Sequence, residues 1–414
     1  MEMIIPDDVQ FILTTLNDNG YKAYIVGGCV RDLFLGIEPH DWDICTSALP
    51  EQTQAVFDGY KIIPTGIKHG TITILINDSQ YEVTTFRIDG DYQDNRHPSE
   101  VVFTTDLIAD LSRRDFTINA MAYNPNENKD VFDFFGGVND LLTSKIRCVG
   151  SPQDRFEEDA LRIMRAIRFS IRFGFDIEEN TLNAMMDKKC LLGNISAERI
   201  CDEVCKTLST KRALSDEQFE ILCNILAVRV PELLKVEIKS ACLRLNTAIK
   251  NDGCLNLRIA LLFDFTPEDT LRILTELRFS NDVIHDVLNI QKYGNYILNN
   301  REWENNDGSV PGYYERCLLH WTGMLSIDSV YYAISHCNEF YRLYKLRHRI
   351  VACHLQKEVC SLSQLAINGN NLKEIGIGEG YLIGKLLNRL LDEVMRDNVP
   401  NDRQILLNRA KEIL

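Results

Sequence analysis

The chain has 414 residues, of which 45% are hydrophobic and 25% are charged, as is typical of a globular protein with about two to four domains. Its net charge of −15 argues against a protein that coats nucleic acid non-specifically, but it allows an enzyme that holds one folded RNA through a local basic strip. No run of about 18 apolar residues is found, so we expect no transmembrane helix, and we also expect no signal peptide. The thirteen cysteines include no C-x-x-C pair, so we expect no zinc site and free thiols in a reducing cytosol.

The first elements predict a strand, a glycine turn and a helix. After a short helix over residues 8–17, the apolar run 24–26 indicates a buried strand, which stops at Gly27 and Gly28 before a helix opens at 30–32. Glycines between a strand and a helix let the backbone approach a ligand, and the exposed N–H groups favour phosphate. The segment therefore predicts a phosphate cradle.

Two acidic residues follow, at Asp41 and Asp43, on either side of Trp42. Alternate side chains of a strand point to the same side, so the two carboxylates would project together while Trp42 points into the core. Two carboxylates beside a phosphate cradle suit Mg²⁺-dependent phosphoryl or nucleotidyl transfer. We therefore expect Asp41 and Asp43 to bind Mg²⁺.

We next expect a helix over 50–56. Two strands are predicted over 67–77 and 81–88, because these segments are rich in β-branched residues. Glu82, on the second strand, is either a solvated edge residue or a third carboxylate of the metal site. The polar stretch 89–98 is either a plain connection or a loop that closes over substrate.

A basic motif follows the segment 106–111. Its sequence, SRRDFTINA, contains Arg114, Asp115 and Asn119, which predict triphosphate clamps and hydroxyl partners; a salt-bridged helix start is the alternative. Residues 131–141 predict a strand and a Gly-Gly turn, the last β-like segment.

From residue 154 onward the hydrophobic period is helical. Arg162, Arg165 and Arg168 are spaced by three and lie close to one helix face, with Asp159 as the neighbour of Arg162. An exposed, salt-bridged helix is the alternative. Helices continue to the end of the chain, with a loop over 299–312.

The most basic stretch lies in the C-terminal part, in a segment that also contains Tyr344 and His348. A solvated helix face is its ordinary explanation, but in an acidic protein it is also the natural place for an RNA backbone. The candidate tRNA-binding residues are Arg342, Lys345, Arg347 and Arg349. The glycines over 376–384 do not have dinucleotide-site spacing, and they indicate a turn between helices.

These motifs together resemble the bacterial class II tRNA nucleotidyltransferases, the CCA-adding enzymes of the polymerase-β-like nucleotidyltransferase superfamily. The matching segments, GGCVRDLFLG, HDWDICT, DNRHP, LSRRDFTINAMAYN, FDFFGG and EEDALRIMRAIRFSIRFGF, occur in order within residues 20–205. The second half matches more loosely, in length, helicity and a block at 368–371. The resemblance implies an α+β fold with a mixed β-sheet in a catalytic head and helices elsewhere. The implied parts are a head (1–145), a neck (146–210), a body (211–300) and a tail (301–414).

The resemblance also implies roles for single residues. Asp41 and Asp43 would be the catalytic Mg²⁺ ligands. The implied nucleotide-binding residues are Gly28, Arg31 and Arg114, with Asp159, Arg162, Arg165 and Arg168 on the neck helix that recognises the base. Further candidates without an assigned role are Gly27, Asp32, Glu82, Asp115, Asn119 and Glu158.

The pair of Asp159 and Arg162 suits base selection without a template. Cytosine and adenine both present an amino donor beside a ring-nitrogen acceptor, whereas guanine and uracil present a carbonyl acceptor beside an N–H donor. An ionised Asp only accepts hydrogen bonds and an Arg only donates them, so the pair matches C and A and opposes G and U. The implied partners are tRNA, CTP and ATP, and a homodimer is left open.

Other readings stay open beside CCA addition. An A-adding enzyme and a bacterial poly(A) polymerase share the head, although poly(A) polymerases usually carry a basic segment where this chain has only Lys68 and His69. The DNRHP loop argues against a CC-only enzyme. A small-molecule nucleotidyltransferase would not need the long helical tail, and a non-catalytic RNA-binding module would not need Asp41 and Asp43 together. A metal phosphohydrolase would need a second His cluster beside His40.

Overall fold

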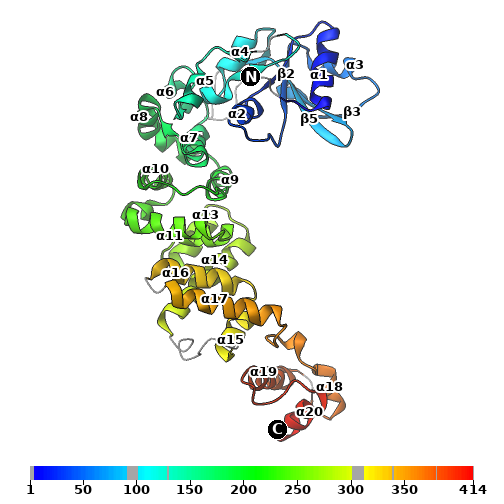
Figure 1. The fold of residues 1–414 in the computed structure, drawn as a ribbon, viewed down its shortest axis with the longest axis vertical. Coiled ribbons are helices and arrows are strands. Elements are labelled where there is room, and N and C mark those ends of the chain that lie inside the picture. Colours follow the sequence, from blue (N-terminus) through cyan, green and yellow to red (C-terminus); the bar gives the residue numbers. More distant parts are fainter. Residues whose placement is uncertain are drawn as a thin grey trace. The chain divides into compact units, whose positions relative to one another are not determined.

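The computed structural model describes residues 4–90, 101–127, 130–300, 312–337, 340–378 and 380–413, and the chain divides into two units at residues 236 and 237 (Figure 1). The first unit carries the β-sheet and the second is helical. This is the α+β fold that the sequence predicted. The DNRHP loop lies outside the described residues, as does most of the loop over 299–312.

A seven-stranded mixed sheet forms the centre of the first unit, with the strand order β3-β4-β5-β2-β1-β8-β9. The middle strand pair β1–β2 is antiparallel, whereas β2 and β5 run parallel. The strands are β1 (Ala23–Val26), β2 (Asp43–Thr46), β3 (Lys61–Gly66), β4 (Thr71–Ile76), β5 (Ser79–Thr85), β8 (Met121–Tyr123) and β9 (Phe132–Asp133). Two small ribbons pair β6 (Arg87–Asp89) with β7 (Val101–Phe103) and β10 (Lys145–Ile146) with β11 (Asp176–Ile177).

The edge strand β3 was not predicted from the sequence, because it contains Pro64. Proline lacks the N–H that a central strand needs, and it is tolerated here because β3 has a neighbour on one side only, with an irregular register between Ile63 and Gly66. The predicted strand over 67–77 is shorter than expected, since residues Ile67–His69 form the 3₁₀ helix η1.

Helices of the first unit cover the sheet and continue beyond it. They are α1 (Asp7–Asp18), α2 (Gly28–Phe34), α3 (Pro50–Val56), α4 (Leu107–Ser112), α5 (Gly137–Leu142), α6 (Pro152–Glu158), α7 (Leu161–Phe173), α8 (Glu179–Lys188), α9 (Ala197–Leu208) and α10 (Asp216–Leu226). Short 3₁₀ helices are η2 (Thr117–Asn119), η3 (Lys189–Asn194) and η4 (Pro231–Lys235). Helix α7 packs against α9 and α10 through a fully buried stripe that includes Met164, Ile167 and Ile171, as the helical period predicted.

The chain breaks between α6 and α7, where the sequence pattern predicted continuous helix. Asp159 has an extended backbone conformation (φ −139°, ψ 102°), so its side chain leaves the face that Arg162 and Arg165 share on α7. Helix α7 ends at Gly174, whose positive φ of 69° favours glycine.

The second unit consists of helices. They are α11 (Ile238–Lys250), α12 (Leu255–Leu262), α13 (Pro267–Glu276), α14 (Asn281–Asn299), α15 (Tyr313–Thr322), α16 (Leu325–His336), α17 (Phe340–Leu355), α18 (Gly369–Glu374), α19 (Tyr381–Met395) and α20 (Arg403–Ile413), with the 3₁₀ helix η6 (Leu362–Gln364). Helices α14 and α16 approach closely because α14 has Gly294 at the contact: a Cβ there would lie 2.3 Å from a ring carbon of Tyr332. No helix in the described part of the chain is long and apolar enough to cross a membrane.

Candidate active site

The turn between β1 and α2 lets charged groups approach the backbone. Gly27 has a positive φ of 76°, and a Cβ on it would lie 3.1 Å from Nη1 of Arg114 and 3.8 Å from Oδ2 of Asp43. A Cβ on Gly28 would lie 3.4 Å from Nη2 of Arg31. The two glycines therefore stand where the sequence predicted a cradle, and the groups around them are a carboxylate and two guanidinium groups.

Asp43 is the first residue of β2, which is antiparallel to β1, so it lies at the end of the sheet where β1 leads into the glycine turn. Asp41 and the half-buried Trp42 precede the strand. Trp42 is thus not part of the core, contrary to the sequence prediction. Burial raises the pKa of Asp43; the charge of Arg114 lowers it, and the nearby Asp41 carboxylate raises it further, so that the net shift is upward. A divalent cation would relieve the repulsion between these two carboxylates, and carboxylate oxygens suit such an ion.

Glu82 lies beside Asp43, because the two residues are register partners on the parallel strands β2 and β5. Its side chain is exposed. Within the described residues, however, no three His, Cys, Asp or Glu side chains come close enough to hold one metal ion. Glu82 is therefore a neighbour of the carboxylate pair, and its role as a third ligand stays a prediction.

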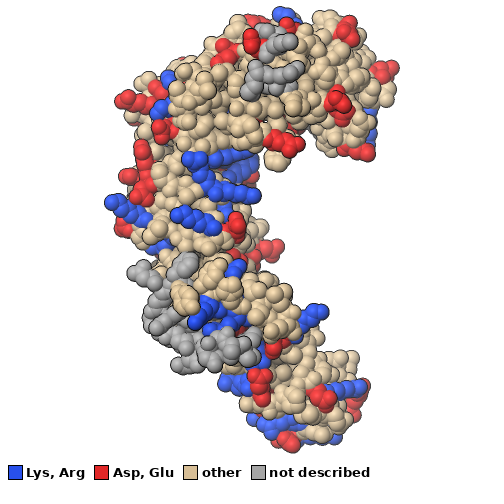
Figure 2. Space-filling model, viewed as in Figure 1, with Lys and Arg blue, Asp and Glu red and all other residues tan. Residues whose placement is uncertain are grey.

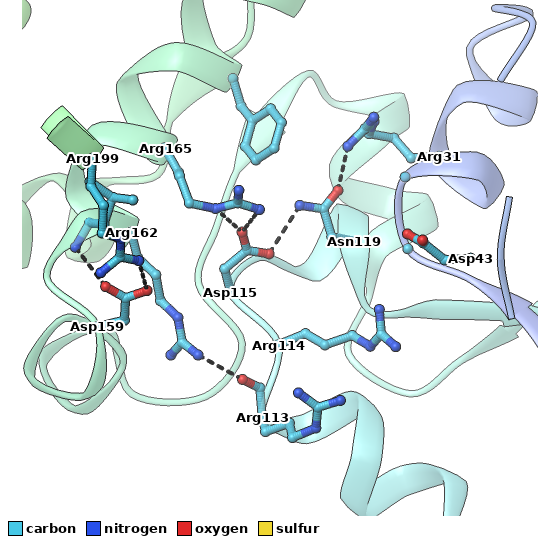
Figure 3. Close-up of a pocket in the computed structure, with 14 residues that line it drawn as sticks. Arg31, Asp43, Arg113, Arg114, Asp115, Asn119, Asp159, Arg162, Arg165 and Arg199 are labelled. Carbon is cyan, nitrogen blue, oxygen red and sulfur yellow. Dashed lines mark hydrogen bonds and ion pairs between the residues drawn. The ribbon is translucent and has the colours of Figure 1, made fainter. Parts of the chain in front are cut away.

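Asp110 of α4 fixes two consecutive arginines that follow the helix. Its buried carboxylate accepts hydrogen bonds from Arg113 (2.8 Å) and Arg114 (3.1 Å). Burial raises the pKa of Asp110, but the charges of Arg114 and Arg113 outweigh it, and the net shift is downward. In the described part of the chain, Nε of Arg114 is buried without a hydrogen-bond partner. Arg114 thus reaches the Gly27 turn with one donor unused (Figure 3).

A chain of hydrogen bonds crosses the site from α2 to α7 (Figure 3). Arg31 donates to Oδ1 of Asn119 over 2.6 Å, and Asn119 donates to Oδ1 of Asp115 over 3.0 Å. Arg165 donates to Oδ2 of Asp115 over 2.6 Å, and Asp32 accepts from Nε of Arg31 over 2.8 Å. Burial raises the pKa of Asp115, but the charge of Arg165 and the hydrogen bonds from Asn119 and Arg165 lower it to about 2.

Asp159 and Arg162 line the same cavity, but they are held by different partners. Oδ2 of Asp159 accepts a 3.0 Å hydrogen bond from Arg199 of α9, and Oδ1 accepts one from the Leu161 N–H. Arg162 donates to Oε2 of Glu158 over 2.6 Å. The sequence did not predict Arg199 as a site residue: it stands 40 residues from Asp159, at what appeared only as a helix start.

These groups surround a cavity of about 440 Å³, a size that suits a nucleotide. It is lined by Gly27, Gly28, Arg31, Asp43, Arg113, Arg114, Asp115, Asn119, Asp159, Leu161, Arg162, Arg165, Phe169 and Arg199. Six arginines face three aspartates, so the lining is net positive and favours a polyanion such as a triphosphate. We call this the arginine cavity.

Arg168 does not line the arginine cavity, although the sequence predicted it as a nucleotide-binding residue. Its Nε donates to Oε2 of Glu203 over 2.6 Å, and both side chains are buried. Asp41 is also absent from the lining.

The basic segment of α17 is only partly exposed. Arg349 is 7% exposed, and its Nε pairs with the buried carboxylate of Glu315 at 2.5 Å. Arg347 is half-buried, with its guanidinium over the rings of Tyr331 and Tyr344. Lys345 is exposed, and the side chain of Arg342 lies outside the described residues. Arg349 is therefore not part of a solvated helix face, and the binding of tRNA by this segment stays a prediction.

Comparisons with known proteins bear on both units. Residues 23–147 match the family described as the poly A polymerase head domain, residues 174–215 the probable RNA- and SrmB-binding site of polymerase A, and residues 256–410 the tRNA nucleotidyltransferase domain 2 family. The chain is 34% identical to the CCA-adding enzyme of Ligilactobacillus salivarius, over 99% of this chain and 98% of that one. It is 36% identical to the CCA-adding enzyme of Lactobacillus helveticus, over 94% and 93% of the two chains.

Solved structures show the same fold. The Bacillus stearothermophilus CCA-adding enzyme in complex with CTP superposes with a TM-score of 0.79 and 28% identity, over 99% of this chain and 98% of that chain. The Thermotoga maritima CCA-adding enzyme complexed with tRNA superposes with a TM-score of 0.69 at 20% identity, over 100% of this chain and 97% of that chain, which is a likeness of fold.

Proposed function

The chain belongs to the family of CCA-adding enzymes, and from this membership and the site we propose that it adds C, C and A to the 3′ end of tRNA, using CTP and ATP and releasing pyrophosphate. It is a nucleotidyltransferase that works without a nucleic-acid template. The observation that carries the proposal is the arginine cavity, where the lining includes both Asp43 and the pair of Asp159 and Arg162. The carboxylate proposed to bind metal and the pair proposed to read the base thus line one nucleotide-sized cavity.

Asp41 and Asp43 would hold the divalent metal that this family generally uses, and we propose Mg²⁺. The donor set fits, because the groups are two nearby carboxylates and the pKa of Asp43 is raised by burial and by the charge of Asp41. When bound, two such ions would supply activation of the 3′-hydroxyl and neutralisation of the leaving pyrophosphate. Asp43 would contribute a negative charge at the start of β2, beside the α-phosphate of a nucleotide bound in the arginine cavity.

Arginines would bind and orient the triphosphate. Arg114 is held by Asp110 and keeps an unpartnered, buried Nε in the described part of the chain. Arg31 is held by Asp32 and Asn119, so its guanidinium has a fixed direction beside Gly28. Donors that are already oriented lose little entropy when they bind phosphate oxygens.

Asp159 and Arg162 would read the base. Asp159 is fixed by Arg199, and Arg162 is fixed by Glu158 and by the backbone oxygens of Arg155 and Arg113. Neither is paired with the other in this way, and both line the arginine cavity. An acceptor beside a donor complements the pairing edges of C and A. With G or U, the carboxylate of Asp159 would face a carbonyl acceptor and the guanidinium of Arg162 would face an N–H donor. Each charged group would then lack a hydrogen-bond partner on the base, which costs several kcal/mol.

Three further assignments rest on the family and on the sequence. We divide the chain into a catalytic head (1–145), a neck (146–210), a body (211–300) and a tail (301–414). Arg165 contributes to the nucleotide site, with Asp115 and Asn119 as its partners. We assign the protein to the cytoplasm, where its thirteen free thiols stay reduced.

A product-length assay tests the function. The protein is incubated with CTP, ATP or both, and with tRNAs that lack the three terminal nucleotides, lack only the terminal A, or are complete. The proposal requires C addition with CTP alone, completion with both nucleotides, and no extension of the complete tRNA. Activity only on the tRNA that lacks the terminal A would indicate an A-adding enzyme, and long A tracts on every substrate would indicate a poly(A) polymerase.

A further inference from the structure

A second cavity of about 960 Å³ lies in the first unit, and its lining is mostly basic and hydroxyl side chains. The lining residues are His40, Arg168, Arg172, Cys205, Lys206, Ser209, Thr210, Lys211 and Arg212. No acidic residue is among them, although the whole chain carries a net charge of −15. We call it the basic groove. Figure 2 shows Lys and Arg side chains gathered over α9, the helix that leads into it.

The groove is lined by five lysine and arginine side chains, of which three lie near carboxylates. Arg168 pairs with Glu203 at 2.6 Å, and Lys206 pairs with Asp202 at 2.7 Å. Arg172 lies 3.8 Å from Asp32.

The other two cations, Lys211 and Arg212, make no side-chain ion pair or hydrogen bond with the residues that the structure describes. Both are exposed. The groove therefore keeps about two uncompensated positive charges, which attract an anion.

The side chain of Arg212 packs against the backbone at the end of α7. Its guanidinium lies directly over Gly174, where a Cβ would be only 2.1 Å from Cζ of Arg212. Gly174 ends α7 with a positive φ of 69°, so the glycine serves the helix end and the close approach of Arg212 at once. The glycine therefore leaves room for the guanidinium of Arg212 beside α7.

The groove and the arginine cavity are neighbours along α7. Arg165 and Phe169 line the arginine cavity, whereas Arg168 and Arg172 line the groove. The groove is also lined by His40, which directly precedes Asp41. An extended chain of phosphates that passes through the groove would thus arrive at the carboxylate pair.

We propose that Lys211 and Arg212 bind two consecutive phosphates of the RNA strand whose 3′-hydroxyl is extended, so that the basic groove positions the primer strand. The proposal rests on the proposed function, because it assumes an RNA substrate. The triphosphate of the incoming nucleotide is the other source of phosphate groups, but it has its own arginines in the neighbouring cavity. The groove therefore contributes to RNA binding and leaves nucleotide binding unchanged.

The test compares the full-length protein with a variant that carries Lys211→Ala and Arg212→Ala. Binding of a tRNA that lacks the three terminal nucleotides is measured without nucleotide at several salt concentrations. Each contact to a single-stranded phosphate contributes about 0.7 to the slope of log K against log salt, so the slope of the variant becomes shallower by about 1.4. Lys22→Ala is the matched control, because Lys22 is exposed and lies at the end of β1 opposite to Gly27.

Two further measurements keep the outcome decisive. In steady-state C addition, the variant should show a KM for tRNA raised by about tenfold or more, and a KM for CTP within about twofold of the unsubstituted protein. Arg212→Lys should restore part of the loss. An unchanged salt slope in a variant that remains folded overturns the inference, as does a rise in the KM for CTP alone. If the unsubstituted protein adds no nucleotide at all, the proposed function fails instead.

Discussion

Arg199 of α9 donates a 3.0 Å hydrogen bond to Oδ2 of Asp159, which lies outside any helix in the break between α6 and α7. The carboxylate that would read the base is therefore oriented from a different helix, rather than by the arginine three residues along the chain. Nη1 of Arg199 is buried and, within the described residues, has no hydrogen-bond partner. If Asp159 reads the base as proposed, base selection depends on the packing of α9 against α7.

The first prediction concerns this relationship. Arg199→Ala should leave Asp159 without its orienting partner, which weakens discrimination between nucleotides more than it weakens phosphate binding. We expect the ratio of kcat/KM for CTP to that for UTP to fall by about tenfold or more, which corresponds to about 1.4 kcal/mol. The measurement is single-nucleotide incorporation with each triphosphate.

Asp159→Ala combined with Arg162→Ala should relax the choice further, because both complementary groups are then missing. Lys206→Ala on the same helix α9 is the control for base choice, since Lys206 pairs with the exposed Asp202 and lines the basic groove, not the arginine cavity. If Arg199→Ala rejects UTP as well as the unsubstituted protein does, Asp159 is oriented by other groups.

The second prediction compares two acidic residues at one register position of neighbouring strands. Asp43→Asn should reduce incorporation by at least about a hundredfold, since even the loss of a supporting partner of a metal ligand costs about 10–100-fold. Glu82→Gln, one strand away, should retain most of the activity, because Glu82 joins no cluster of three ligands in the described part of the chain. Incorporation rates at saturating tRNA measure both effects.

Binding of tRNA by Asp43→Asn should be unchanged, which separates a chemical defect from a folding defect. Near-normal turnover of Asp43→Asn would refute the metal assignment. A loss of activity in Glu82→Gln equal to that in Asp43→Asn would instead make Glu82 the third ligand.

Local sequence patterns predicted the part of the site that local geometry builds. Gly27 and Gly28 appear at the strand–helix turn, and Asp43, Arg114 and Asp115 come together around it, since the motifs that contain them lie on neighbouring strands or next to them. A turn between a strand and a helix is set by a few adjacent residues, so its signal is visible in the sequence.

The features that the sequence did not predict depend on contacts between residues far apart in the chain, or on a residue type that is rare in the element where it occurs. The helical pattern runs on through Asp159, and only the packing of α6 and α7 against other elements shows the break. The edge strand β3 contains Pro64, which argues against a strand. Arg199 reaches Asp159 because α9 packs against α7, and the sequence alone does not show this packing.

The third prediction concerns pH. The pKa of Asp115 is lowered to about 2, against about 3.9 for an unfolded aspartate, so its ionised form stabilises the folded protein. A lowered carboxylate pKa contributes stability that is fully present above the unfolded value and is lost as the pH falls toward the folded value. Asp115→Asn should therefore lower the free energy of unfolding by about 2–3 kcal/mol at pH 7.

The difference between Asp115→Asn and the unsubstituted protein should stay constant between about pH 8 and pH 5 and shrink as the pH falls below about 4. Denaturant unfolding at each pH measures it. Asp202→Asn on the surface of α9 is the control, and its effect should be within about 0.5 kcal/mol at every pH. A difference that grows on acidification would show that Asp115 is not held ionised by Arg165.

The last prediction separates two basic residues of α17. Arg349 is buried against Glu315, so Arg349→Ala leaves an uncompensated buried carboxylate and should lower the free energy of unfolding by about 3–5 kcal/mol. Lys345→Ala removes an exposed cation and should change stability by less than about 0.5 kcal/mol. Denaturant unfolding and tRNA binding are measured for both variants.

An apolar replacement of the buried pair isolates the cause. Arg349→Met combined with Glu315→Leu removes both charges, and it should recover most of the stability that Arg349→Ala loses, because no charge is then left unpaired. At a temperature where each variant is folded, that double variant should bind tRNA as the unsubstituted protein does, since both residues are buried. Weaker tRNA binding together with unchanged stability in Arg349→Ala would instead identify Arg349 as an RNA contact and its pairing with Glu315 as incidental.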